Sequence, residues 1–561
     1  MYTLLQHFKD VFPVIVALSL AIFILTQLTV LKKHQWFWLS ATTFSLGLTI
    51  VYIYLVIIDN FSTGYLVCRR SGDDDCGVYP FFYKGQYVLN EWWTVLTSIT
   101  LIFGWIIFPI FGRINAKWLY YLCIICSYFA WVLLSFLITR KAKFDIKNFG
   151  IIYSNTWSLL VIIPFMSIGL VELPKYLWNR SDPKKYLAHL QQTTPKIRKE
   201  LFDAEMEFSE SVALFVDIID QLDSNDECYD LANHIYNTSP EFKCGPHLLP
   251  SSQFNHPLPI TSSYITSVYN KITSLKHTQS KLQTQWNNHL KTSFLVEDVV
   301  DNLYSSDHRL TSSLKILTGD RMENFKLTIS WWYNVYLVPV FLKLLSAFSF
   351  ILGIVIVWSE ITFTVTSPTL SIIAILFERI SGNYNIQNCV TLVILPYMFL
   401  ATIFGLLSIK PFKHYSITIN RQNDLHSIFW ICIQLVTIAP TLIYNYVTMA
   451  QMGDYGKHPI VFNHMYSYFM DSAAFLGKYF NYYLPIAIGV FVTLIVLKLH
   501  ISLLKLINLN IIEYYSGLEC AKVDGRSILA SERSKREREF QPDNNISEND
   551  FNRDPHNIAT N

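Results

Sequence analysis

The sequence predicts an all-α protein that crosses a membrane several times and carries a helical domain between two groups of spans. Three observations support this fold class. Only 15% of the 561 residues are charged and 52% are hydrophobic, whereas a soluble globular chain carries about a quarter charged residues. The hydrophobic residues gather in blocks of about 20, the helix length needed to cross a bilayer core of about 30 Å. A polar stretch of roughly 160 residues with helical periodicity separates these blocks.

Nine hydrophobic blocks are long enough to be transmembrane helices. Five precede the polar stretch, at 11–31, 36–58, 92–112, 118–138 and 150–171, and four follow it, at 333–357, 387–409, 424–447 and 481–503. The first block lacks a small-residue cleavage site and is therefore expected to be a retained span. The sequence also lacks the strands of about ten alternating residues that a membrane β-barrel would need.

The blocks divide the chain into a five-span region (1–171), a polar helical domain (172–330), a four-span region (331–510) and a tail (511–561). The segment 361–378 contains Pro368 and is followed by Arg379, which leaves too few apolar residues for a further crossing. We expect this segment to be re-entrant or to lie in the outer leaflet. The tail is rich in polar residues and is predicted to be disordered.

The orientation follows from basic residues in short loops, because cytoplasmic loops carry an excess of Lys and Arg. If 361–378 does not cross, the basic residues after spans one, three, seven and nine share one side of the membrane. They include Lys32, Lys33, Arg113, Lys117, Lys410, Lys413, Arg421, Arg533 and Arg536. The loop 140–147 disagrees. We expect the N-terminus outside, and the polar domain and the C-terminus in the cytoplasm.

Apolar residues recur at heptad spacing in two parts of the polar domain, from Ile197 to Leu222 and from Ile265 to Leu303. Two long amphipathic helices joined by a loop of Ser, Pro and Asn predict an antiparallel hairpin or coiled coil that projects from the membrane. The alternative is two separate helices that pack on the cytoplasmic ends of the spans.

Two charged residues, one inside the sixth predicted span and one at its outer end, are candidate intramembrane functional residues. Lys343 comes about ten residues into the span, where a charge costs at least about 2.5 kcal/mol. It would contact a substrate or, alternatively, snorkel to the interface. Glu360 comes at the outer end of the span, where it would face a cavity or simply be solvated.

Three further residues lie in segments predicted to be outside the membrane. Cys68 and Cys76 could close a disulfide, and the alternative is two free thiols. Asn60 begins the tripeptide N-F-S, a candidate site for glycosylation.

Several function classes are excluded by what the sequence lacks. A net charge of +2 indicates no nucleic-acid partner. There is no phosphate-binding glycine loop, no zinc-protease motif and no nucleophile elbow, so we predict no catalytic residue, no cofactor and no metal. The expected partners are the lipid bilayer and other proteins that bind the helical domain.

Several motifs in order resemble the limb-region-protein-like (LMBR-like) membrane proteins, in particular the branch called LMBR-domain-containing protein 2. They are GLVELPKYLWNRSDP from Gly169, TQSKLQTQW ending at Trp286, WWYN from Trp331, IVIVWSEITF from Ile354, and INRQNDLHSIFW around Leu425. The resemblance covers about residues 1–515. It implies nine spans, an outside N-terminus, a cytoplasmic coiled-coil region and no enzymatic activity.

The resemblance also implies a function. It suggests a receptor-like or scaffolding regulator of signalling, in particular of G-protein-coupled receptors, with membrane receptors as partners. The alternative is a transporter or transporter-accessory subunit, as in lysosomal cobalamin export. We expect the plasma membrane as the location, with endolysosomal membranes as the alternative.

Overall fold

The computed structural model divides the chain into two compact units. Unit 1 comprises Met1–Trp178 and Lys343–Tyr515, and unit 2 comprises Asn179–Leu342 and Ser516–Asn561. The structure describes residues 2–29, 36–70, 83–104, 146–222, 227–239, 260–312, 321–365, 367–380, 383–408, 425–451, 460–471, 480–499 and 525–540.

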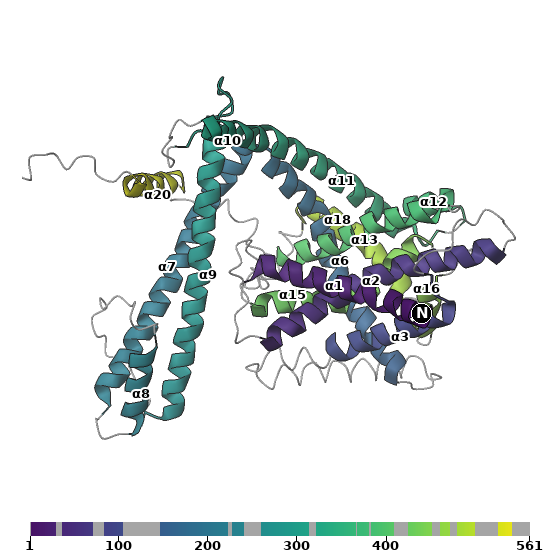
Figure 1. The fold of residues 1–561 in the computed structure, drawn as a ribbon, viewed down its shortest axis with the longest axis horizontal. Coiled ribbons are helices and arrows are strands. Elements are labelled where there is room, and N and C mark those ends of the chain that lie inside the picture. The colour runs from purple at the N-terminus through teal and green to yellow at the C-terminus, as the bar shows by residue number, and fades with distance from the viewer. Residues whose placement is uncertain are drawn as a thin grey trace, which may run out of the picture. The chain divides into compact units, whose positions relative to one another are not determined.

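The described residues of unit 1 form a bundle of helices (Figure 1). The helices of its first half are α1 (Tyr2–Leu28), α2 (Trp36–Arg70), α3 (Gln86–Ile102) and α6 (Ile146–Ser181), whose last turn extends into unit 2. Those of its second half are α11 (Val338–Thr362), α12 (Ile372–Arg379), α13 (Tyr384–Leu407), α15 (Leu425–Met449), α16 (Val461–Asp471), α17 (Phe480–Tyr483), η5 (Leu484–Ile486) and α18 (Ala487–Val496).

Five helical stretches in the described residues are long and apolar enough to cross a membrane. They are Trp36–Leu66, Gly150–Ser181, Asn324–Thr362, Asn385–Leu407 and Ser427–Met449. Each overlaps one of the predicted spans, so an all-α membrane protein is confirmed. Shorter apolar helices occupy Val14–Leu28 and Leu484–Val496, and the predicted span 118–138 lies outside the described residues. The number nine stays a prediction.

The bundle core depends on a close antiparallel crossing of α6 and α13. A Cβ atom added to Gly169 would lie 1.8 Å from the carbonyl oxygen of Ala401, and one added to Gly405 would lie 1.8 Å from that of Phe165. Each glycine therefore packs directly on the backbone of the other helix. Small residues permit this approach in membranes, where close packing replaces the hydrophobic effect between helices.

The segment predicted to be re-entrant contains α12, which is only eight residues long. Its start lies at the end of the bundle where α11 and α15 end, because Ser371 Oγ donates to the carbonyl oxygen of Met449 and Ile373 N donates to Ser359 Oγ. Eight helical residues span about 12 Å. Whether the segment enters the bilayer or lies at its surface stays a prediction.

Unit 2 is built on two long helices, α7 (Pro183–Gln221) and α9 (Ser262–Asp301), with α8 (Glu227–Thr238) near one end (Figure 1). Asp182 and Thr261 cap the two N-termini by accepting hydrogen bonds from Lys184 N and Tyr264 N. The helices pack antiparallel, since their buried apolar residues form two clusters along the shared face. The unit also contains α10 (Arg321–Trp331), η3 (Trp332–Leu337) and α20 (Gly525–Phe540).

The prediction of a disordered tail is wrong for residues 525–540. They form α20, which lies against α7 and α9 with Leu529 only 3% exposed. The sequence shows two adjacent apolar residues within a charged stretch, so it gives no amphipathic periodicity. Packing against α7 and α9 stabilises this helix, which the composition of the tail did not indicate. The rest of the tail lies outside the described residues.

Candidate functional site

Glu360 is fully buried at the end of α11, with no exposed side-chain area. Asn445 on α15 donates from Nδ2 to Glu360 Oε1 at 2.6 Å. Glu360 Oε2 has no hydrogen-bond partner among the residues that the structure describes. A buried acid with one free oxygen is a candidate site for a proton, a cation or a polar solute. Simple solvation at the interface, the alternative weighed from sequence, does not describe this position.

A second buried acid, Asp59 on α2, differs from Glu360 because both of its carboxylate oxygens accept hydrogen bonds. It accepts hydrogen bonds from Trp93 Nε1 at 2.9 Å, Phe462 N at 2.8 Å, Val461 N at 3.0 Å and Thr63 Oγ1 at 3.1 Å. Two of these donors open α16, where backbone N–H groups have no partner inside the helix. Asp59 therefore has a structural role, which the sequence reasoning missed because its span ended at residue 58.

Asn60, predicted as a candidate for glycosylation, is only 6% exposed. Its Nδ2 donates to Asn388 Oδ1 on α13 at 2.8 Å. A glycan is attached to this nitrogen on an exposed side chain, so burial argues against glycosylation. Asn388 Nδ2 has no partner within the described ranges, so the interior of unit 1 contains an unsatisfied amide as well as the unsatisfied oxygen of Glu360.

The other predicted site residues do not join Glu360. Lys343 lies on the exposed face of α11 and is 17 residues from Glu360 on the same helix, a separation of about 25 Å. The two therefore cannot form an ion pair. Whether Lys343 contacts a substrate or snorkels to the interface stays a prediction. Cys76 and the side chain of Cys68 lie outside the described residues, so their disulfide stays a prediction.

Unit 2 contains a second candidate site, where α20 docks on the hairpin. Leu529 enters a buried cluster with Leu201 of α7 and with three residues of α9. These three residues are Trp286, Leu290 and Phe294. The cluster is apolar and central, so it anchors α20 by removing a large aliphatic side chain from water.

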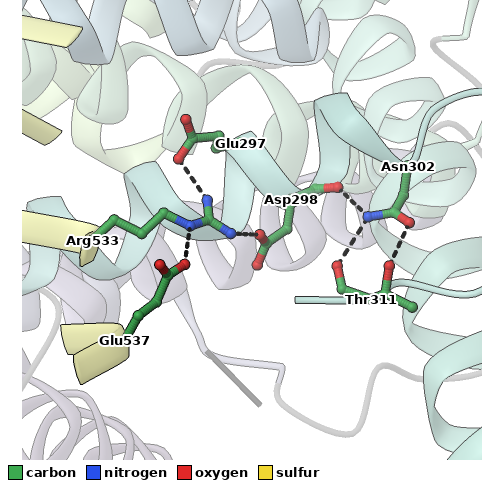
Figure 2. Close-up of polar contacts among 6 residues, drawn as sticks. All are labelled: Glu297, Asp298, Asn302, Thr311, Arg533 and Glu537. Atoms are coloured by element: carbon green, nitrogen blue, oxygen red, sulfur yellow. Dashed lines mark hydrogen bonds and ion pairs between the residues drawn. The ribbon is translucent and has the colours of Figure 1, made fainter. Parts of the chain in front are cut away.

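Arg533 connects α20 to two acidic residues near the end of α9 (Figure 2). Its Nη1 lies 2.6 Å from Glu297 Oε2, and its Nη2 lies 2.5 Å from Asp298 Oδ1. Glu537, one turn later on α20, lies 3.5 Å from Arg533 Nε. A guanidinium that is largely buried among three carboxylates forms charge-assisted hydrogen bonds, which are stronger than exposed ion pairs.

Asn302 ends α9 next to this ion-pair network (Figure 2). Its Nδ2 donates to the carbonyl oxygens of Asp298 at 2.8 Å and Thr311 at 3.0 Å. Its Oδ1 accepts from Thr311 Oγ1 at 2.9 Å. The carbonyl oxygen of Asp298 also accepts from the backbone N–H of Asn302 at 3.0 Å, so these bonds connect the end of α9 to Thr311 and fix the backbone that presents Asp298.

A polar pair lies within the packed face of α7 and α9. Thr194 Oγ1 and His289 Nε2 are 2.8 Å apart, and the side chain of His289 stacks on Trp286. Burial lowers the pKa of His289 to about 4, with a smaller contribution from the nearby His189. The imidazole is therefore neutral at physiological pH.

Unit 2 is expected to lose stability as the pH falls below about 6.5, because the unfolded chain binds a proton at His289 more readily than the folded one. The contribution is fully present above 6.5, and about 2 kcal/mol of it is lost by pH 5. Hydrogen exchange of α7 and α9 between pH 7.5 and 5 measures it. His289→Gln should flatten this dependence, and His277→Gln, on the same helix, should leave it unchanged.

Comparison with known proteins identifies the class of membrane protein that these helices form. The model of the LMBR1-like membrane protein family matches residues 11–500. The chain therefore belongs to the LMBR1-like membrane protein family.

The curated relatives are distant. The chain is 23% identical over 424 residues to the human G-protein coupled receptor-associated protein LMBRD2, a match that covers 71% of this chain and 60% of the relative. It is 21% identical over 584 residues to the protein of the same name from Gallus gallus, covering 94% and 83%. It is 23% identical over 377 residues to the Drosophila melanogaster LMBR1 domain-containing protein 2 homolog, covering 64% and 54%. The chain thus matches less than two thirds of the human and fly relatives. No solved structure matches it significantly.

Proposed function

We propose that this chain is a receptor-associated scaffold that regulates signalling from a membrane, without an enzymatic reaction of its own. Unit 1 anchors the protein in the bilayer, and unit 2 binds protein partners. The observation that carries the proposal is the docking of α20, because the hairpin already holds a helix from a distant part of the chain. Binding an amphipathic helix in a groove is a common mode of protein recognition.

The partners are G-protein-coupled receptors or proteins bound to them. The printed names of the human and chicken relatives support this choice. Unit 2 and the tail lie in the cytoplasm and the N-terminus lies outside, as the distribution of basic loop residues favours. The plasma membrane is the proposed location, with endolysosomal membranes as the alternative.

Proximity labelling from the C-terminus of the full chain tests the scaffold role. Receptors and G proteins should be labelled above the level given by the same ligase on an unrelated multi-pass protein of that membrane. Lys343→Leu and Glu360→Gln should leave the labelling unchanged, because neither residue belongs to unit 2. Labelling no stronger than that of the unrelated protein would contradict the proposal.

The second candidate function is transport, and the free oxygen of Glu360 is the observation that favours it. Glu360→Gln keeps the size of the side chain and an oxygen toward Asn445, but removes the acid. If the chain transports a solute, this variant should fold normally and lose uptake in reconstituted liposomes. Labelled cobalamin is the probe that the family resemblance suggests. Uptake by wild type no faster than by empty liposomes would exclude this role for cobalamin.

A further inference from the structure

The contacts between α20 and the hairpin define a groove with three parts. The first part is a backbone carbonyl group of α7 on which the backbone of α20 packs. Pro195 lacks an N–H group, so the carbonyl of Gln191, four residues earlier, has no helical donor. Gly525 packs on this carbonyl, and a Cβ atom added to Gly525 would lie 1.9 Å from the oxygen. Only a segment with glycine at this point can approach so closely.

The second part of the groove is apolar. Leu529 fills it and Ile528 packs beside it, one turn after Gly525. Leu201 contributes from α7, and Trp286 and Phe294 contribute from α9. The groove therefore exists only where the two long helices lie side by side.

The third part combines an acidic rim, which pairs with one arginine, and an aromatic ring, which contacts two. Arg533 pairs with Glu297 and Asp298. Arg536, three residues later, lies with its guanidinium 5.6 Å from the ring centre of Phe294. Arg533 lies 5.8 Å from the same ring. Acidic groups beside an aromatic ring select arginine rather than lysine, because the guanidinium is planar and can both pair and stack.

The contacting residues occupy one face of α20, at relative positions 0, 3, 4, 8 and 11 counted from Gly525. Exposed positions between them include Ala530, Ser534 and Lys535. The groove thus recognises a pattern and not a whole sequence. The pattern is a glycine, two apolar residues one turn later, and two arginines in the following two turns.

We propose that this groove is a docking site for a basic amphipathic helix of a second protein, and that α20 is its resident occupant. The proposal rests on the proposed scaffold function only for the identity of the partner as a receptor. Cytoplasmic segments next to transmembrane helices are rich in Lys and Arg, so receptors supply helices of this charge. The acidic rim formed by Glu297 and Asp298 complements them.

Fluorescence anisotropy of a labelled peptide tests the proposal on the full-length protein in nanodiscs. The peptide keeps the five contacting residues of 525–540 and replaces the exposed ones by other helix-forming residues. In the variant Leu529→Asp/Arg533→Glu, α20 is released from the groove. The affinity of the peptide for this variant should be at least tenfold higher than its affinity for the wild-type protein. Lys535→Glu, an exposed position of α20, should behave like wild type. A peptide with Glu in place of the first arginine should bind neither chain.

Reversing the charges of both the groove and the peptide tests the same pairing in a second way. The Glu-containing peptide should regain binding when a chain released by Gly525→Val also carries Glu297→Arg and Asp298→Arg, because Arg533 of its own tail is then repelled from the groove. Gly525→Val provides a second released chain without a charge change. The proposal would be overturned if the peptide with the five original contacting residues bound neither released chain. It would also be overturned if this peptide bound the wild-type and released chains equally. So would a dimer of wild type that the release variants dissolve, because the occupant would then be the tail of a second copy. The assay contains no receptor, so its result does not depend on receptor association.

Discussion

Gly169→Ala is expected to destabilise the membrane bundle strongly, although it adds only one methyl group. The new methyl carbon would overlap the carbonyl oxygen of Ala401, 1.8 Å away. A backbone atom in the middle of α13 cannot turn aside as a side chain can. The helices must separate, which breaks the reciprocal contact of Gly405 with Phe165. Overpacking typically costs about 1–3 kcal/mol, and a backbone clash lies at or above the upper end. Thermal unfolding followed by tryptophan fluorescence measures the loss.

Gly150→Ala is the matched control, since it lies on the same helix α6 and, outside the backbone of that helix, no atom of the described residues lies within 4 Å of its added Cβ. Alanine there should leave the melting temperature unchanged or raise it, because alanine favours helix by about 1 kcal/mol over glycine. Equal melting temperatures for Gly169→Ala and Gly150→Ala would show that α6 and α13 do not approach as described.

Asp59→Ala is expected to have a comparably large effect. It would leave four donors without an acceptor in the interior of unit 1, among them Trp93 Nε1 and Phe462 N. Each unsatisfied buried group costs about 1–3 kcal/mol, so the four donors together predict a loss of at least about 4 kcal/mol. The melting temperature and the fraction of monodisperse protein after purification report this loss.

Two graded variants control for the change in volume. Thr63→Val removes one of the four donors and should cost about 1 kcal/mol. Asp59→Asn keeps one acceptor oxygen and should fall between wild type and Asp59→Ala. If all three variants have the same melting temperature as the wild-type protein, Asp59 does not connect α2 to α16.

The sequence predicted the long apolar helices well, because hydrophobic length is a strong signal in a membrane protein. It predicted less about polar residues near the ends of spans. Glu360 and Asn60 lie where an apolar block meets a polar segment, and sequence alone does not distinguish a solvated end from the buried end of a longer helix. The α2 helix continues to Arg70, well beyond the predicted end of its span at 58.

The docked tail could not be predicted for a different reason. Ile528 and Leu529 are the only aliphatic residues larger than alanine in α20, so local periodicity is too weak to indicate a helix. Its order depends on partners more than 200 residues earlier in the chain, Glu297 and Asp298. Such long-range contacts leave no trace in composition.

The polar pair of Thr194 and His289 fixes the alignment of the two long helices. A shift of α9 along α7 by one heptad, about 10 Å, would separate the two side chains and take the imidazole of His289 away from Thr194 Oγ1, whereas the aliphatic contacts around them would tolerate the shift. Thr194 would keep its bond to the carbonyl oxygen of Leu190 on its own helix. The apolar and acidic residues that receive α20 come from both helices. The position of Gln191 along α7 relative to Phe294 and Glu297 on α9 therefore depends on the pair of Thr194 and His289.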